Sequence, residues 1–287
     1  MVSKVSMVLA GCAALLPGVA LAQSPPPSVD ALIARHIAAR GGYAALKAIH
    51  TLEMTGTLRP AGFDADLQYK ELIARPDSVR IEATLQGMTP IQAFDGQSGW
   101  QIQPFQGRRD PETLSSDDDK SLVEEADFED ALVDYKAKGE TVDYLGEVDV
   151  DGGPTYAVRA TLKNGDQQTF YIDPDAWLTV RMVTRQKLRG AETLTETDYG
   201  DYEKVNGVYF PFEVDSGPKG SAQLQRVTYK TISANVALDP AIFREPKGPA
   251  VGVQQATTPA RPEDKKALPP NAPDTSGKAV KPPVAKR

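Results

Sequence analysis

The 287-residue sequence has little cysteine and little histidine: one cysteine, Cys12, and two histidines, His36 and His50. Cys12 lies in the N-terminal leader described below. We therefore expect a mature chain without disulfides, a catalytic thiol, cysteine-ligated zinc or thioether-linked haem. The two histidines are separated by Gly41-Gly42 and lack the spacing of a zinc site. The sequence thus predicts neither a metal site nor a cofactor.

The motifs of common enzyme classes are lacking as well. No serine, histidine and aspartate occur in a nucleophile-elbow context, and no glycine-rich phosphate loop is present. Asp117-Asp118-Asp119 lacks the loop glycine and the twelfth-position glutamate of an EF-hand. The net charge of −7 disfavours nucleic acid as a partner. These features together predict a non-enzymatic protein.

Residues 1–22 have the pattern of a secretory signal peptide, with Lys4, an apolar run and the cleavage site Ala20-Leu21-Ala22. A lipobox, Leu9-Ala10-Gly11-Cys12, lies inside the run. Only Val5 to Val8 separate it from Lys4, too few for a complete apolar region. We therefore predict cleavage after Ala22 and a soluble periplasmic protein. A lipid anchor on Cys12 is the alternative.

Residues 248–287 contain no aromatic residue, eight prolines, and seven lysines and arginines against three acidic residues. Such a segment cannot bury enough apolar area to offset the entropy cost of ordering it. We predict a disordered tail rich in proline, alanine and lysine, following a single domain at 23–247. The tail serves solubility or, because it is basic, makes a weak contact with an anionic membrane surface.

The predicted domain opens with a helix from the N-cap Ser28 to Gly41-Gly42. Apolar residues then alternate with polar ones, which is typical of strands with one buried face. Asn164-Gly165 predicts a type I′ hairpin. Residues 110–139 interrupt the alternation with an acidic, helical pattern that starts near Ser115 or Ser116. The expected order is a helix, about five strands, a helical insert and about six strands.

Five segments carry a resemblance to a known family: "HIAARGGYAALKAIHTLEMTGTL", "ELIARPDSVRIEA", "AFDGQSGWQIQPFQGR", "YIDPDAWLTVRMV" and "DYGDYEKVNGVYFPFEV". In this order they resemble the periplasmic lipoprotein-carrier superfamily, LolA/LolB-like, which includes outer-membrane lipoprotein-sorting proteins. The resemblance implies a mainly β fold with α: a strongly curved antiparallel half-barrel of about 11 strands. An N-terminal helix and the mid-chain helical insert would close it over an apolar cavity.

The resemblance implies a site for acyl chains, for which burial of each methylene contributes roughly 0.8 kcal/mol. The expected cavity residues are Met54, Leu67, Tyr69, Ile81, Leu85, Trp100, Ile102, Tyr156, Phe170, Ile172 and Met182. The alternative is that they form a filled core. Arg75 resembles the family arginine that hydrogen-bonds toward the lid, although an Arg-Pro at a strand end is also typical of a solvated turn. His36 fits a core residue.

These features predict a periplasmic binding protein that holds acyl chains of lipids or lipoproteins, in lipoprotein sorting or envelope maintenance. The alternative is a partner-binding or sensory envelope module on the same scaffold, with envelope proteins as partners.

Overall fold

The computed structural model describes residues 28–247. The predicted signal peptide, 1–22, and the predicted tail, 248–287, lie outside the described residues. Among residues 28–247, no helix is both long enough and apolar enough to cross a membrane.

The first helix, α1 (Val29–Ala39), confirms the prediction at both ends. The Ser28 hydroxyl accepts a hydrogen bond from the Ala31 amide at 3.3 Å, and Gly41 follows the helix with a φ of +125°. A Cβ at Gly41 would meet the Gly207 carbonyl oxygen at 2.2 Å, so this position also requires glycine for close approach. A second, short helix, α2 (Tyr43–Lys47), leads into the sheet.

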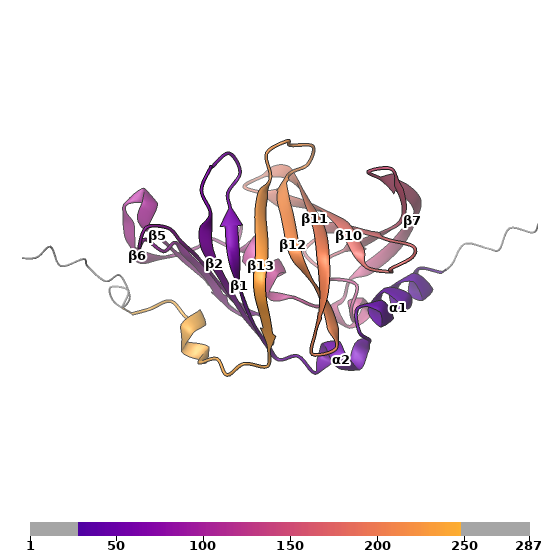
Figure 1. Cartoon of the computed structure of the whole chain (residues 1–287), viewed down its shortest axis with the longest axis horizontal. Helices are drawn as coiled ribbons and strands as arrows, with labels where there is room; N and C mark the ends of the chain where they lie inside the picture. Colours follow the sequence, from indigo (N-terminus) through magenta and orange to yellow (C-terminus); the bar gives the residue numbers. More distant parts are fainter. Residues whose placement is uncertain (1–27, 248–287) are drawn as a thin grey trace, which may run out of the picture. The chain divides into compact units, whose positions relative to one another are not determined.

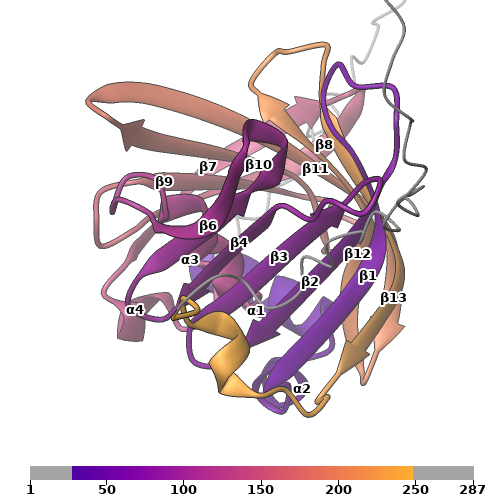
Figure 2. The ribbon, with the colours of Figure 1, turned by 90° about the vertical axis from the view of Figure 1, so that its left-hand side faces the viewer.

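All strands of the described residues, 28–247, belong to one antiparallel sheet of 13 strands. Its spatial order is β6-β5-β4-β3-β2-β1-β13-β12-β11-β10-β9-β8-β7. The bounds are β1 Thr51–Arg59, β2 Leu67–Ala74, β3 Ser78–Thr84, β4 Ile91–Asp95, β5 Gly99–Gln103, β6 Arg108–Thr113, β7 Thr141–Val150, β8 Gly153–Thr161, β9 Gln167–Ile172, β10 Thr179–Leu188, β11 Ala191–Val205, β12 Val208–Pro218 and β13 Gln225–Ala234. The sheet curves and is not closed into a barrel: β6 and β7 are its opposite edges (Figures 1 and 2). The predicted curved antiparallel sheet is thus confirmed.

The predicted count of about 11 strands is wrong. The edge strand β6 is largely exposed and has no clear alternation of apolar and polar residues. The edge strand β7 does alternate, with Val142, Tyr144, Val148 and Val150 between polar residues, so its pattern was available in the sequence. In β11 the inward positions hold threonine and tyrosine instead of aliphatic residues.

The Asn164-Gly165 hairpin joins β8 to β9 as predicted, but its turn is not type I′. That type requires positive φ at both central residues. Gly165 has a φ of +88°, whereas Asn164 is not in this region. Instead the Asn164 side-chain oxygen accepts a hydrogen bond from the Asp166 amide at 2.9 Å.

The helical insert connects the two edges of the sheet, because it leaves β6 and returns at β7. It contains two short helices, α3 (Lys120–Ala126) and α4 (Tyr135–Lys138). The first helix begins at Lys120 and not near Ser115, because the three aspartates before it form a turn.

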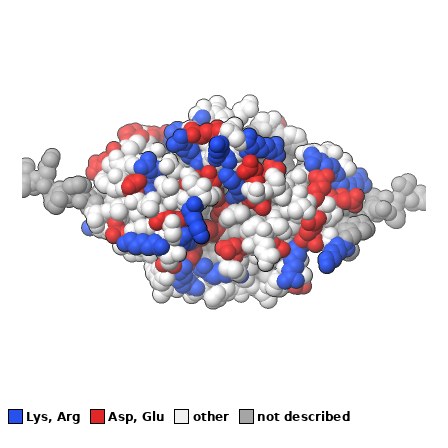
Figure 3. Space-filling view, turned by 180° about the vertical axis from the view of Figure 1, so that it is seen from behind, with Lys and Arg blue, Asp and Glu red and all other residues white. Residues whose placement is uncertain are grey.

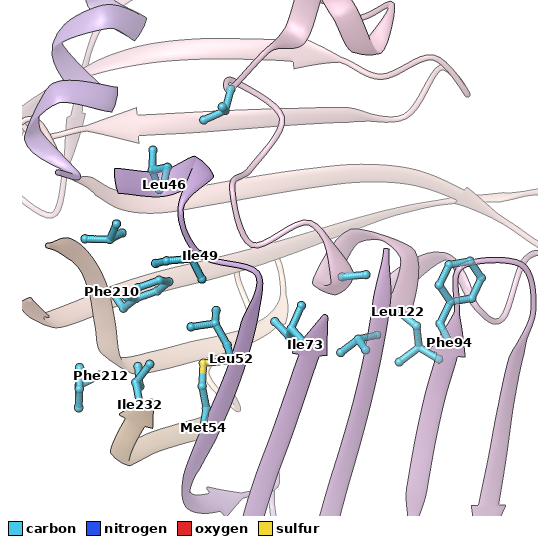
Figure 4. Close-up of a cluster of buried hydrophobic side chains, with 14 residues drawn as sticks. Leu46, Ile49, Leu52, Met54, Ile73, Phe94, Leu122, Phe210, Phe212 and Ile232 are labelled. Carbon is cyan, nitrogen blue, oxygen red and sulfur yellow. The ribbon is translucent and has the colours of Figure 1, made fainter. Parts of the chain in front are cut away.

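The insert packs against two of the three buried hydrophobic clusters of the described residues. Leu122, Ala126 and Val133 pack with the β1–β3 and β12–β13 side chains, some of which are shown in Figure 4. Ala131 and Leu132 pack with α1 and with β8 and β9. The insert therefore joins both halves of the sheet from its concave side.

Candidate functional site

A cavity of about 990 Å³ lies between the concave face of the sheet and the insert. Its walls come from β1, β2 and β9–β13, with contributions from α1 and α3. This volume is at the upper end of the range for sites that enclose small molecules.

The cavity wall changes from apolar to polar along the strands. On β12, inward-facing positions run from Phe210 through Val214 to Ser216. On β13, they run from Ile232 through Val227 to Gln225. Because these strands are antiparallel and Val214 pairs with Val227, the two gradients point the same way. The cavity thus has an apolar end and a polar end.

The apolar end lies near α2. The cavity is lined there by side chains that also belong to the core cluster of Figure 4: Leu52, Met54, Ile73, Phe210 and Ile232. They continue into the fully buried side chains of Leu46 and Ile49. The sheet wall at this end is apolar, and the ion pair of Arg75 with Glu129 lies beside it.

The polar end carries a row of uncharged side chains across five strands, which we call the polar row. Its members are Gln168, Thr184, Gln186, Thr195, Thr197, Ser216 and Gln225. Neighbours in the row are cross-strand partners: Gln168 with Thr184, Thr184 with Thr195, Thr197 with Ser216, and Ser216 with Gln225. The row therefore forms one continuous hydrogen-bonding surface.

The structure brings four of the eleven predicted cavity residues together in the wall: Met54, Tyr69, Phe170 and Met182. The other seven, Leu67, Ile81, Leu85, Trp100, Ile102, Tyr156 and Ile172, are not part of the lining. Ile172 is buried under α1, and the Tyr156 ring stacks on Trp177 with ring centroids 5.2 Å apart. Ile81 packs against the core cluster of Figure 4.

Trp100 and Ile102 lie on the opposite, convex face of the sheet. Gly99, the neighbour of Trp100, faces Leu114 and Asp119 of the insert, so strand alternation directs Trp100 away from the cavity. The Trp100 indole N–H donates to the Phe243 carbonyl at 2.7 Å, within a short 3₁₀ helix, Pro240–Phe243. Trp100 thus anchors the segment after β13.

Arg75 lies between the sheet, α2 and the insert. Its guanidinium donates to the carbonyls of Ile49 at 2.7 Å and Leu46 at 3.1 Å, and to the Glu129 carboxylate at 2.5 Å. It also stacks over the Phe128 ring at 4.8 Å from the centroid. The predicted arginine therefore contacts the insert directly.

A second arginine, Arg40, was not predicted and binds the same segment of the insert. It donates to the Phe128 and Glu129 carbonyls at 3.0 and 2.7 Å, and to the Asp130 carboxylate at 2.6 Å. The buried His36 also contacts Asp130, at 3.4 Å. Burial raises the pKa of Asp130, but the Arg40 charge and the His36 hydrogen bond outweigh it, and that pKa falls below its usual value. The ionised Asp130 is thus held in the insert.

A buried carboxyl group, Glu71, faces α3 from β2. It accepts hydrogen bonds from the hydroxyls of Tyr69 at 3.0 Å and Tyr229 at 2.8 Å. Burial, together with the charge and hydrogen bond of Glu125 on α3, raises the pKa of Glu71 well above its usual value. Glu71 is fully buried within the otherwise apolar inward series of β2, which was a signal available in the sequence.

Two carboxyl groups of α3, those of Glu124 and Glu125, line the cavity, Glu124 beside the polar row and Glu125 beside Glu71. Glu124 accepts a hydrogen bond from the Gln186 amide. Burial raises the pKa of Glu124 to about 7, against the opposing hydrogen bonds from Gln186 and Gln168. Burial raises the pKa of Glu125 above its usual value as well.

Acidic and basic side chains are interspersed on the face opposite to the view of Figure 1 (Figure 3). The described residues contain no group of three or more histidine, cysteine, aspartate or glutamate side chains arranged to hold a metal. The site is therefore a cavity whose wall changes from apolar at one end to hydrogen-bonding at the other.

No family model and no curated protein matches the sequence. Solved structures do match. A DUF1329 family protein from Desulfovibrio piger has a TM-score of 0.53 at 15% identity, over 75% of this chain and 97% of that one. A LolA superfamily protein from Nitrosomonas europaea has a TM-score of 0.51 at 12% identity, over 74% of this chain and 96% of that one. At these identities the likeness concerns the fold, and this chain has a LolA-like fold.

Proposed function

We propose that this protein is a non-enzymatic periplasmic binding protein that holds acyl chains of lipids or lipoproteins, in lipoprotein sorting or envelope maintenance. The observation that carries the proposal is the graded cavity of about 990 Å³ under the insert. An acyl chain gains roughly 0.8 kcal/mol for each methylene removed from water, so an apolar end of this kind supplies most of the affinity. The LolA-like fold supports the same proposal.

In this proposal the insert is the lid of the cavity and Arg75 is its tether. Arg75 connects the Leu46 and Ile49 carbonyls, next to the apolar end, with Glu129 of the insert. Lys47 donates a hydrogen bond to the same Glu129 carboxylate at 2.7 Å. Burial raises the pKa of Glu129, and the hydrogen bonds from Arg75 and Lys47 more than offset this, so the pKa is lowered. The contact therefore joins charged groups.

The test is lipid binding by purified mature protein. Native mass spectrometry should detect co-purified lipid, and a fluorescent acyl probe should bind one site saturably. Met182→Glu places a carboxylate in the cavity wall, and its desolvation should weaken probe binding by about tenfold or more. Val148→Glu, at an exposed position of the edge strand β7, is the matched control and should bind as wild type does. Circular dichroism should show both variants folded.

A partner-binding module is the second candidate, and the β7 edge favours it. Among the described strands β7 pairs with β8 alone, and Leu145 and Val148 are exposed on it. An exposed strand edge can accept an extended segment of another protein. Absence of both co-purified lipid and probe binding would reject the carrier proposal and favour this module.

A further inference from the structure

The polar end of the cavity resembles a site for a headgroup, and its chemistry restricts which headgroup it accepts. The hydroxyls of Thr184, Thr195, Thr197 and Ser216 face the cavity in one continuous row. The amides of Gln168 and Gln225 extend the row at its two ends. All six side chains are uncharged and can both donate and accept hydrogen bonds.

Among the described residues that line the cavity, no lysine or arginine is free to pair with an anionic group. The lining contains four lysines and arginines, and each is already paired with a carboxylate: Arg40 with Asp130, Arg75 with Glu129, Lys120 with Asp166, and Lys138 with Asp127. Burying an anion without a paired cation is strongly unfavourable. A phosphate or carboxylate headgroup would therefore have to break an existing ion pair.

The wall instead offers acceptor atoms. The Glu124 carboxyl of α3 lies beside the polar row and accepts a hydrogen bond from Gln186. A further oxygen of the lining, Glu140 Oε2, is buried without a hydrogen-bond partner among the described residues. Unpaired acceptors favour a ligand that donates hydrogen bonds.

We propose that the ligand is an amphiphile whose headgroup carries hydroxyl groups and no negative charge. The headgroup lies against the polar row, and the acyl chain runs toward the Phe210 end. This inference rests on the proposed function and specifies the ligand class for the same cavity. It commits the site to recognition of hydroxyl groups through Thr184, Thr195, Thr197 and Ser216.

The test compares amphiphiles with the same palmitoyl chain and different headgroups, by displacement of a fluorescent acyl probe below their micelle concentrations. 1-Monopalmitoylglycerol carries two hydroxyls, 1-palmitoyl lysophosphatidic acid carries a phosphate, and methyl palmitate carries neither. Monopalmitoylglycerol should bind at least about tenfold more tightly than the lysophosphatidic acid, because no unpaired cation of the lining is available to the phosphate. Glycerol alone should not displace the probe, which separates a lipid headgroup from a free polyol.

A variant pair tests the polar row itself. In Thr195→Val/Thr197→Val the shape is kept and two hydroxyls are lost. This variant should bind monopalmitoylglycerol about 5- to 30-fold more weakly, at roughly 1 kcal/mol for each hydrogen bond, and methyl palmitate unchanged. Thr169→Val is the matched control, because Thr169 alternates with Gln168 and Phe170 of the lining on β9 and lies on the other face.

Three results would overturn the inference while leaving the proposed function intact. The first is lysophosphatidic acid binding as tightly as monopalmitoylglycerol. The second is an equal loss of methyl palmitate binding in the double threonine variant. The third is displacement of the probe by glycerol alone. If no palmitoyl compound binds wild-type protein, the proposed function itself fails, and the inference fails with it.

Discussion

Both halves of the sheet are antiparallel meanders, but one half is covered by core side chains and the other lines the cavity. In the β3–β6 region the insert packs directly on the concave face, with Leu122 and Ala126 joining Phe94 and Val79 in the core. No residue of β3 to β6 lines the cavity, whereas β9 to β13 provide most of the sheet residues of its wall. The position of one insert thus decides which half of a curved sheet becomes core and which remains open to a ligand.

The largest effect we expect comes from a core substitution in the packed half. Leu122→Ala should lower the free energy of unfolding by about 2–4 kcal/mol, because it leaves a hole between α3 and the sheet. Met182→Ala, in the cavity wall of the open half, should cost less than about 1 kcal/mol, since the cavity is already there. Urea unfolding of both variants measures the difference. Equal losses would show that the open half is packed as well.

Arg75→Leu sharpens the comparison by weakening the attachment of the insert. It should lower the free energy of unfolding by about 1–3 kcal/mol, because the nearly buried Glu129 carboxylate loses one of its two cations. Uptake and release of a bound acyl probe should both accelerate if Arg75 holds the lid closed. Stopped-flow fluorescence measures these rates, with Arg59→Leu, at an exposed ion pair, as the control. Unchanged rates in a folded Arg75→Leu protein would contradict the tether role.

The smallest effect concerns Glu124, on the open side of α3. Its pKa is raised to about 7 in the folded protein, against an ordinary 4.5, so the folded state retains the proton more strongly than the unfolded state. The resulting stability is complete below pH 4.5 and is lost as the pH rises through about 7. Glu124→Gln should therefore gain about 1–2 kcal/mol over wild type at pH 8. At pH 4 the two should be equal, and a gain of the same size there would reject burial of Glu124 as its cause.

Local patterns in the sequence predicted the elements that local physics determines. The Ser28 N-cap and the Gly41-Gly42 end define α1, and the alternating apolar positions predict most of the sheet. The same alternation did not predict β11. Its inward face is a cavity wall of threonine and tyrosine, so the strand carries polar residues on both faces.

The site was harder to predict than the fold. Alternation places Trp100 and Gly99 on opposite faces of β5, but it does not say which face is concave. The contacts of Arg40 with Glu129 and Asp130 join residues about 90 positions apart, and no local pattern indicates such pairs. The contact of Arg75 with the lid is implied by the family resemblance alone, because an Arg-Pro at a strand end is equally typical of a solvated turn.

The pairing of β1 with β13 in the middle of the sheet has a consequence for folding kinetics. Every other neighbouring pair of strands is consecutive in the chain, whereas this seam joins Leu52 to Ala234. Closing such a long loop costs more entropy than forming a hairpin, and contacts between distant residues slow folding. We expect the two meanders to form early as separate units and the seam between them to close late. The cavity, whose walls come from both sides of that seam, would then be among the last parts of the molecule to form.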